Sequence, residues 1–70
     1  MPTPVHAEIS GNVWKIDVAE GAQVAEGDTL IIMESMKMEI PVEAPAAGVC
    51  RFVVSEGQSV QEGELLANIE

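Results

Sequence analysis

Short strand-like runs, rich in β-branched residues, alternate with polar turns that contain glycine along most of the chain. Residues 13–18 form the first run, Val24 stands between two turns, and residues 29–33 form the next run. The same order returns between residues 49 and 69. Runs this short and this closely spaced predict a sandwich or barrel of β-hairpins rather than helices. The pattern therefore predicts an all-β fold.

The two stretches are copies of one pattern. When the sequence is shifted by 36 positions, nine of the 22 residues from 13 to 34 match identically. The identical pairs are Val13/Val49, Val18/Val54, Glu20/Glu56, Gly21/Gly57, Val24/Val60, Glu26/Glu62, Gly27/Gly63, Leu30/Leu66 and Glu34/Glu70, and the conservative pairs are Lys15/Arg51 and Asp28/Glu64. Trp14 falls on Cys50 at this shift. We expect two similar halves that pack differently at Trp14 and Cys50.

Glycine and proline mark the turns and one edge. Four glycines each follow a glutamate between strands, where a left-handed backbone favours glycine: Gly21, Gly27, Gly57 and Gly63. No lysine or helix signal follows them, which disfavours a phosphate-binding loop. Pro41 and Pro45 bracket the strand-like residues 42–44, which predicts an edge strand or a strand that ends early.

The segment between the copies, residues 35–46, is where we look for function. Apolar runs at residues 30–33 and 40–42 flank it, which predicts a β-hairpin with its tip at Met36 and Lys37. Tight hairpin turns favour Asn-Gly or Asp-Gly because their central residues need positive φ, so Met-Lys is a poor turn. Such a conflict is expected at functional positions. The alternative is that Lys37 is an ordinary surface lysine and that Met36 and Met38 fill the core.

Composition limits what the chain can do. Of its 70 residues 47% are hydrophobic, with one Phe, one Trp and no Tyr, so we expect one compact domain, residues 1–70, with an aliphatic core and loosely ordered residues 1–6. A chain this short leaves little room for an active site of its own. Its net charge of -9 disfavours binding to nucleic acid or to anionic membranes.

Other features give weaker indications. Cys50 has no partner for an internal disulfide, and no secretory signal or apolar stretch of membrane-spanning length is evident, so we expect a cytoplasmic protein. Cys50 is interpreted as a small buried hydrophobe. His6 has no cysteine or second histidine near it with which to share a metal.

The central segment resembles the attachment motif of biotin carboxyl carrier domains, which belong to the biotinyl/lipoyl attachment family. Met36-Lys37-Met38 follows Glu34-Ser35 and precedes Glu39 and residues 40–42. Residues 44–48, 56–60 and 62–66 also match, so the resemblance runs from about residue 9 to residue 70. The chain departs from the family at residues 7–11, where the family often has Ala-Pro-Met-Pro-Gly, so the conformation of the N-terminal strand stays open.

The resemblance implies a fold and a function. The fold is a flattened β-barrel of two four-stranded antiparallel sheets related by pseudo-two-fold symmetry. The protruding thumb loop of some relatives is absent, because residues 13–24 and 49–60 are equally long. A biotin protein ligase would attach biotin to Lys37, a biotin carboxylase would load it with a carboxyl group using ATP and bicarbonate, and a carboxyltransferase would pass that group on.

The resemblance also implies roles for residues around Lys37. Met36 and Met38 would form a recognition surface, and the chain would have no catalytic residues of its own. Glu34, Ser35 and Glu39 are candidates for ligase recognition, with the alternative that Glu34 and Glu39 are solubilising charges. One alternative is a lipoyl carrier domain of a 2-oxo acid dehydrogenase-type complex, whose motif usually reads Asp-Lys-Ala. The other is an unmodified small acidic interaction module.

Overall fold

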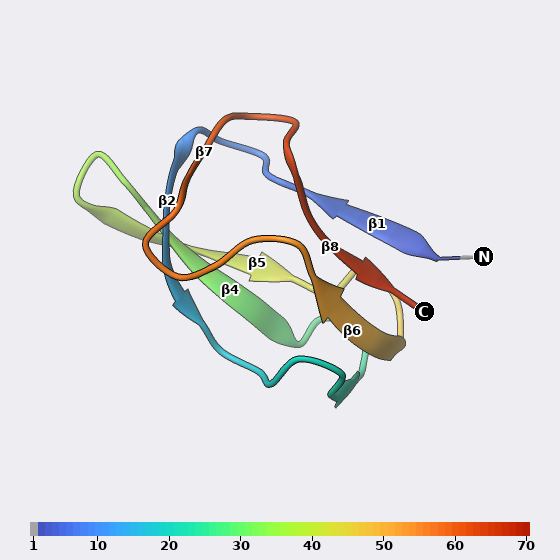
Figure 1. Cartoon of the computed structure of the whole chain (residues 1–70). Helices are drawn as coiled ribbons and strands as arrows, with labels where there is room; N and C mark the ends of the chain where they lie inside the picture. Colours follow the sequence, from blue (N-terminus) through green and yellow to red (C-terminus); the bar gives the residue numbers. More distant parts are fainter. Residues whose placement is uncertain (1) are drawn as a thin grey trace.

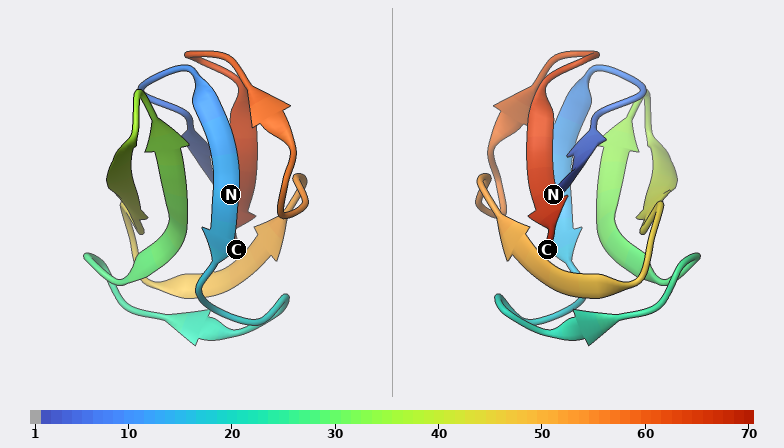
Figure 2. Two further views of the ribbon diagram at one scale, coloured as in Figure 1. Left: turned by 90° about the vertical axis from the view of Figure 1, so that its left-hand side faces the viewer. Right: turned by 90° about the vertical axis from the view of Figure 1, so that its right-hand side faces the viewer.

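The computed structural model describes residues 2–70, which form eight strands in two four-stranded antiparallel sheets (Figure 1). The strands are β1 (Thr3–His6), β2 (Gly11–Ile16), β3 (Gln23–Val24), β4 (Thr29–Ser35), β5 (Met38–Glu43), β6 (Gly48–Phe52), β7 (Ser59–Val60) and β8 (Leu65–Ile69). One sheet has the order β1-β8-β6-β3 and the other β5-β4-β2-β7. Figure 2 shows the strands ringed around a common interior. The predicted fold class is confirmed.

The two sheets are copies of one another. Strands β5, β4, β2 and β7 take the same places in their sheet as β1, β8, β6 and β3 take in theirs. The registers agree: Pro4 pairs with Asn68 as Pro41 pairs with Ile32, and the next pair is Val5 with Ala67 in one sheet and Val42 with Ile31 in the other. The predicted internal symmetry is therefore confirmed.

The register also corrects the expected pairing of Trp14 with Cys50. Cys50 pairs with Ile69, which corresponds to Met33, and the partner of Met33 is Val13. Val13 and Cys50 are both 0% exposed, so they are the equivalent positions. Trp14 is an inserted residue at a register shift between Val13 and Lys15, and it has no counterpart in the second copy.

Because of this insertion, the repeat continues before Val13 at a shift of 37. The pairs that a shift of 36 misses are Pro4/Pro41, Val5/Val42, Ala7/Ala44 and Gly11/Gly48. The matching backbone hydrogen bonds Ala7 N–H to Glu64 O at 2.9 Å and Ala44 N–H to Asp28 O at 2.8 Å support this alignment. A β-bulge of one residue explains the change of shift.

The expectation of loose order over residues 1–6 is wrong for residues 3–6. Thr3–His6 form β1 and pair with β8, because Val5 buries its side chain in the core opposite Ala67. Burial of one face of a strand specifies its register. Met1 lies outside the described residues.

The core is built from aliphatic side chains, as the composition predicts. Its largest fully buried members are Leu30, Ile31, Met33, Leu66, Val13 and Cys50. The expectation that Cys50 is a small buried hydrophobe is confirmed. Burial, and secondarily the charge of Glu20, raises the pKa of the Cys50 thiol. Desolvation disfavours the thiolate, so this cysteine is protonated at neutral pH.

The turns have the predicted backbone. Gly21, Gly27, Gly57 and Gly63 have φ of 80°, 91°, 87° and 88°. Strand β5, which contains Pro41, lies at the edge of its sheet, as predicted. The connections β2–β3 and β6–β7 are equally long, so neither copy carries an extra loop there.

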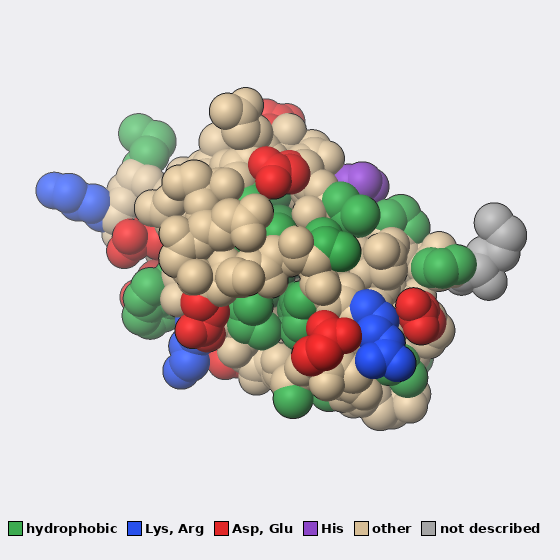
Figure 3. Space-filling model, viewed as in Figure 1, with side chains coloured by type: hydrophobic (Ala, Val, Ile, Leu, Met, Phe, Trp, Pro, Cys, Tyr) green, Lys and Arg blue, Asp and Glu red, His purple; other side chains and the backbone are tan. Residues whose placement is uncertain are grey.

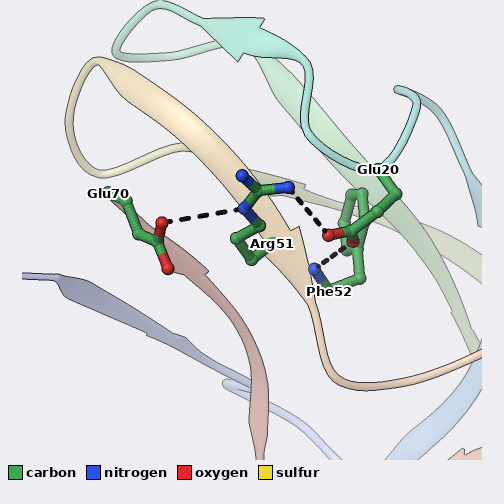
Figure 4. Close-up of polar contacts among 4 residues, drawn as sticks. All are labelled: Glu20, Arg51, Phe52 and Glu70. Carbon is green, nitrogen blue, oxygen red and sulfur yellow. Dashed lines mark hydrogen bonds and ion pairs between the residues drawn. The ribbon is translucent and has the colours of Figure 1, made fainter.

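The repeated glutamates connect the two copies. The carboxylate of Glu20 accepts a hydrogen bond from the Phe52 amide at 2.8 Å, and that of Glu56 accepts one from the Ile16 amide at 2.8 Å. Arg51 lies between Glu20 and Glu70, at 3.6 Å from a carboxylate oxygen of each (Figure 4). These ion pairs are solvent-exposed and contribute little, whereas the paired amide bonds fix how the copies meet.

Candidate functional site

The predicted hairpin between the two copies is present, with its tip at Met36 and Lys37. Ser35 pairs with Met38 at the end of the β4–β5 ladder, which leaves only these two residues in the turn. Their φ angles are 52° and 66°. A two-residue hairpin of this kind needs positive φ at both positions, and each non-glycine residue there costs about 1–2 kcal/mol. The strain stands at the position where the sequence predicts it.

The hairpin projects from the end of the molecule opposite the chain termini (Figure 1). The described chain is elongated, with extents of 32 × 19 × 18 Å. The internal symmetry explains this geometry, because the place that the hairpin takes beside β4 and β5 corresponds to the place of the chain ends beside β8 and β1. Lys37 therefore stands at one end of the long axis, away from the strands that form the core.

The side chains at the tip face solvent. Met36 is 90% exposed and Met38 is 64% exposed, and Lys37 is also exposed. The alternative that the two methionines fill the core is therefore wrong. Among residues 2–70, Lys37 has no carboxylate within ion-pair distance, so its amine is available to another molecule.

The stem below the tip is fixed by contacts with the first copy. The hydroxyl of Ser35 donates a hydrogen bond to the backbone carbonyl of Ser10 at 2.9 Å. A Cβ on Gly11 would stand 2.5 Å from the carbonyl oxygen of Glu34, so only glycine allows β2 to pass this closely. Ser35 thus has a structural contact, and its predicted part in ligase recognition stays a prediction.

Glu34 and Glu39 lie directly opposite one another on β4 and β5, and both are exposed. Like charges at directly opposed positions destabilise a sheet, so folding does not account for this pair. Two carboxylates beside a projecting amine give the tip a mixed charge pattern that another protein can recognise. Their part in ligase recognition stays a prediction.

The other chemistry-bearing residues lie elsewhere. Lys15 is exposed but lies within β2, without a turn to present it. His6 Nδ1 lies 3.1 Å from the carbonyl oxygen of Gly63. Residues 2–70 contain no group of three or more His, Cys, Asp or Glu side chains that could hold a metal ion. The same residues include no helix long and apolar enough to cross a membrane.

Sequence reasoning missed one exposed residue of interest. Trp14 is 49% exposed and lies on β2 between the levels of Met33 and Ile32 on β4. Its place outside the repeat is visible in the sequence only when residues 3–13 are aligned at a shift of 37 and the later residues at 36. The change of shift between Val13 and Lys15 is the signal that could have found it.

The comparisons with known proteins identify the family of the chain. A family model named Biotin_lipoyl and described as "Biotin-requiring enzyme" matches residues 1–69. A "Biotinylated protein TB7.3 homolog" of Mycobacterium leprae is 49% identical over 70 residues, covering 99% of both chains. A "Biotin/lipoyl attachment protein" of Bacillus subtilis is 41% identical over 66 residues, covering 93% of this chain and 90% of that protein.

A solved structure extends the comparison to a large enzyme. The crystal structure of the Kluyveromyces lactis urea carboxylase matches with a TM-score of 0.93 and 34% identity, covering 100% of this chain. The match takes up only 6% of that structure's chain. The fold therefore occurs both in relatives of about this length and as a small part of a carboxylase. The family match spans nearly the whole sequence, and the chain belongs to the Biotin_lipoyl family of biotin-requiring proteins.

Proposed function

We propose that Lys37 is covalently biotinylated and that the protein carries a carboxyl group between the active sites of a biotin-dependent carboxylase. The observation that supports this most is the position of Lys37, whose exposed amine stands at the tip of a strained two-residue turn. The urea carboxylase with a matching domain supports the link to carboxylation. The name of the Mycobacterium leprae relative supports biotin as the attached group.

The residues at the tip fit attachment of biotin. In the reaction Lys37 Nζ would lose a proton and attack the activated carboxyl carbon of biotin, forming an amide while the activating group leaves with its bonding electrons. Among the described residues nothing encloses Lys37, so a biotin protein ligase must supply the environment that removes the proton. Once attached, biotin supplies a ureido nitrogen that can take up and release a carboxyl group.

This chain's own contribution would be to hold the attached biotin and to present it to the partner enzymes. The β4–β5 ladder and the Ser35–Ser10 hydrogen bond fix the base of the arm, while the exposed turn leaves Lys37 free to enter a partner's cleft. Tethering keeps the attached group at a high effective concentration near each active site without dissociation. Catalysis would belong to the partners, a biotin carboxylase and a carboxyltransferase.

The neighbours of Lys37 would serve recognition. Met36 and Met38 offer flexible apolar contacts to several partners in turn, which suits a carrier that visits different enzymes. The ligase would recognise the carboxylates of Glu34 and Glu39. We also place the protein in the cytoplasm, where a reduced Cys50 thiol in the core is expected to persist.

The test is uptake of a labelled carboxyl group. Biotinylated protein is incubated with a purified biotin carboxylase subunit, ATP and radiolabelled bicarbonate, and label bound to the protein is counted. We expect label on the wild type and on Lys15→Arg, and none on Lys37→Arg. Wild-type protein that carries biotin yet acquires no label would refute the carboxyl-carrier function.

A further inference from the structure

The outer face of the β5-β4-β2-β7 sheet carries an apolar stripe across its three long strands. Lys15 pairs with Ile32, and Ile32 pairs with Pro41. Residues paired across strands share a face, and Lys15 and Pro41 are exposed, so Ile32 faces outward with them. Trp14, next to Lys15 at the bulge, is 49% exposed. We call Trp14, Ile32 and Pro41 the outer stripe.

The second copy of the fold serves as an internal control for this stripe. In the other sheet, Asn68 occupies the position equivalent to Ile32, and Arg51 the position equivalent to Lys15. No residue there is equivalent to Trp14. Pro41 has the counterpart Pro4, but at the positions of Ile32 and Lys15 that sheet forms the same registers with polar side chains. Folding therefore does not require an apolar stripe, and packing does not explain the inserted tryptophan.

Acidic residues flank the outer stripe along β4 and β5, and the basic Lys15 lies beside Trp14 on β2. Glu34 and Glu39 form the paired row nearer the hairpin tip, and Glu43 lies beyond Pro41 on the same side of β5. Carboxylates are also spread over the face of the molecule that Figure 3 shows. An exposed tryptophan beside an apolar stripe that acidic rows flank on β4 and β5 fits a partner surface that has an apolar hollow with basic side chains on one side of it.

We propose that the outer stripe docks the enzyme that carboxylates the group on Lys37, a proposal that rests on the proposed function. That enzyme must bind ATP and bicarbonate, which are both anions, so a basic entrance to its active site is expected. The stripe lies three ladder positions, or about 10 Å, below the turn, so a protein seated on it can reach the end of an arm attached to Lys37. The ligase must instead enclose the Lys37 amine and so docks around the tip.

The experiment compares biotinylated variants in carboxylation by a purified biotin carboxylase subunit, with kcat and KM for the carrier measured separately. Trp14→Gln removes the indole, and Ile32→Asn copies Asn68 of the other sheet. Val53→Gln is the matched control, because Val53 is 53% exposed and follows β6 in the second copy. Thermal melts check folding, and the rate of biotinylation by a ligase is measured for each variant.

We expect Trp14→Gln to raise KM by about tenfold with kcat unchanged, the loss typical of an aromatic anchor. Ile32→Asn should raise KM by a smaller factor, Trp14→Phe should recover part of the loss, and Val53→Gln should stay within about twofold of the wild type. Biotinylation rates should not change. KM should also rise with salt concentration, because the flanking rows are charged.

Three results would overturn the proposal. In the first, both stripe variants keep KM within about twofold of the wild type. In the second, Val53→Gln loses as much as they do. In the third, Trp14→Gln slows the ligase by the same factor, which would make the ligase the occupant. If Trp14→Gln does not fold, Ile32→Asn decides alone. A wild-type carrier that takes up no carboxyl group would refute the proposed function and the stripe with it, whereas normal variants beside an active wild type would refute the stripe alone.

Discussion

The carboxylate of Glu20 accepts a hydrogen bond from the backbone amide of Phe52, 32 positions further along the chain, with 2.8 Å between Oε1 and N. Its counterpart Glu56 does the same for Ile16. We predict that Glu20→Ala lowers the free energy of unfolding by about 1 kcal/mol, because an amide loses a charged acceptor at an exposed site. Glu20→Gln should lose less, since its amide oxygen can still accept.

Urea denaturation measures this effect. The control is Glu26→Ala, which removes an exposed, repeated glutamate from a turn and should change the unfolding free energy by less than about 0.5 kcal/mol. Equal losses for Glu20→Ala and Glu26→Ala would show that the cross-copy hydrogen bond contributes nothing specific.

Substitution of the turn glycines should destabilise through the backbone alone. Gly27 and Gly63 have φ of 91° and 88°, and a Cβ at either position would meet nothing within 4 Å. We predict that Gly27→Val or Gly63→Val costs about 1–3 kcal/mol, since a β-branched residue is strained at positive φ. Thermal melts measure the change. Unchanged melting temperatures for both variants would contradict the left-handed turns.

The stability cost of replacing a methionine should depend on whether its side chain is buried. Met36 and Met38 are exposed, whereas Met33 is 1% exposed. We predict that Met36→Ala and Met38→Ala change the unfolding free energy by no more than about 0.5 kcal/mol, while Met33→Ala lowers it by about 2–5 kcal/mol. Denaturant melts test this, beside carboxylation assays on the biotinylated forms. If Met36→Ala or Met38→Ala destabilises the fold strongly while carrier activity stays normal, these side chains serve packing and not recognition.

Cys50 should give the stability a dependence on alkaline pH. Burial first, and Glu20 second, raises the pKa of its thiol, so the folded protein holds this proton to higher pH than the unfolded chain does. The resulting stabilisation is complete below the unfolded pKa of about 8.5 and is lost as pH rises through the folded pKa. We predict that stability above pH about 8.5 falls more steeply in the wild type than in Cys50→Val.

The variant Cys50→Val places the residue of the equivalent position, Val13, in the second copy. Urea midpoints measured on both proteins from neutral to alkaline pH isolate the thiol, because the other titrating groups are shared. Parallel curves would show that Cys50 does not contribute to the pH dependence.

The sequence predicts most of the fold because its internal repeat is strong. The prediction is wrong where the inserted Trp14 changes the offset between the two copies from 37 to 36 positions. The glycine turns, the edge strand with Pro41 and the hairpin tip follow from local backbone preferences. The strand Thr3–His6 is not evident from the sequence because its match to β5 appears only at a shift of 37. That shift depends on the bulge at Trp14, and a bulge leaves no signature in hydrophobic pattern alone.

The candidate site is predictable to a different degree. A two-residue turn made of Met36 and Lys37 conflicts with local preference, and this conflict marks the tip in the amino-acid sequence itself. The exposure of Met36 and Met38 does not follow from composition, because methionine is common in cores. Likewise, the hydroxyl contact of Ser35 with Ser10 depends on pairing between distant strands.

Intact-mass analysis with peptide mapping shows whether Lys37 is the residue that carries biotin. The protein is expressed with an active biotin ligase, beside Lys37→Ala and the matched control Lys15→Ala. We predict one biotinyl group on the wild type and on Lys15→Ala, mapped to Lys37, and none on Lys37→Ala. Biotin on Lys15, a lipoyl group on Lys37 in its place, or an unmodified wild-type protein would contradict this prediction.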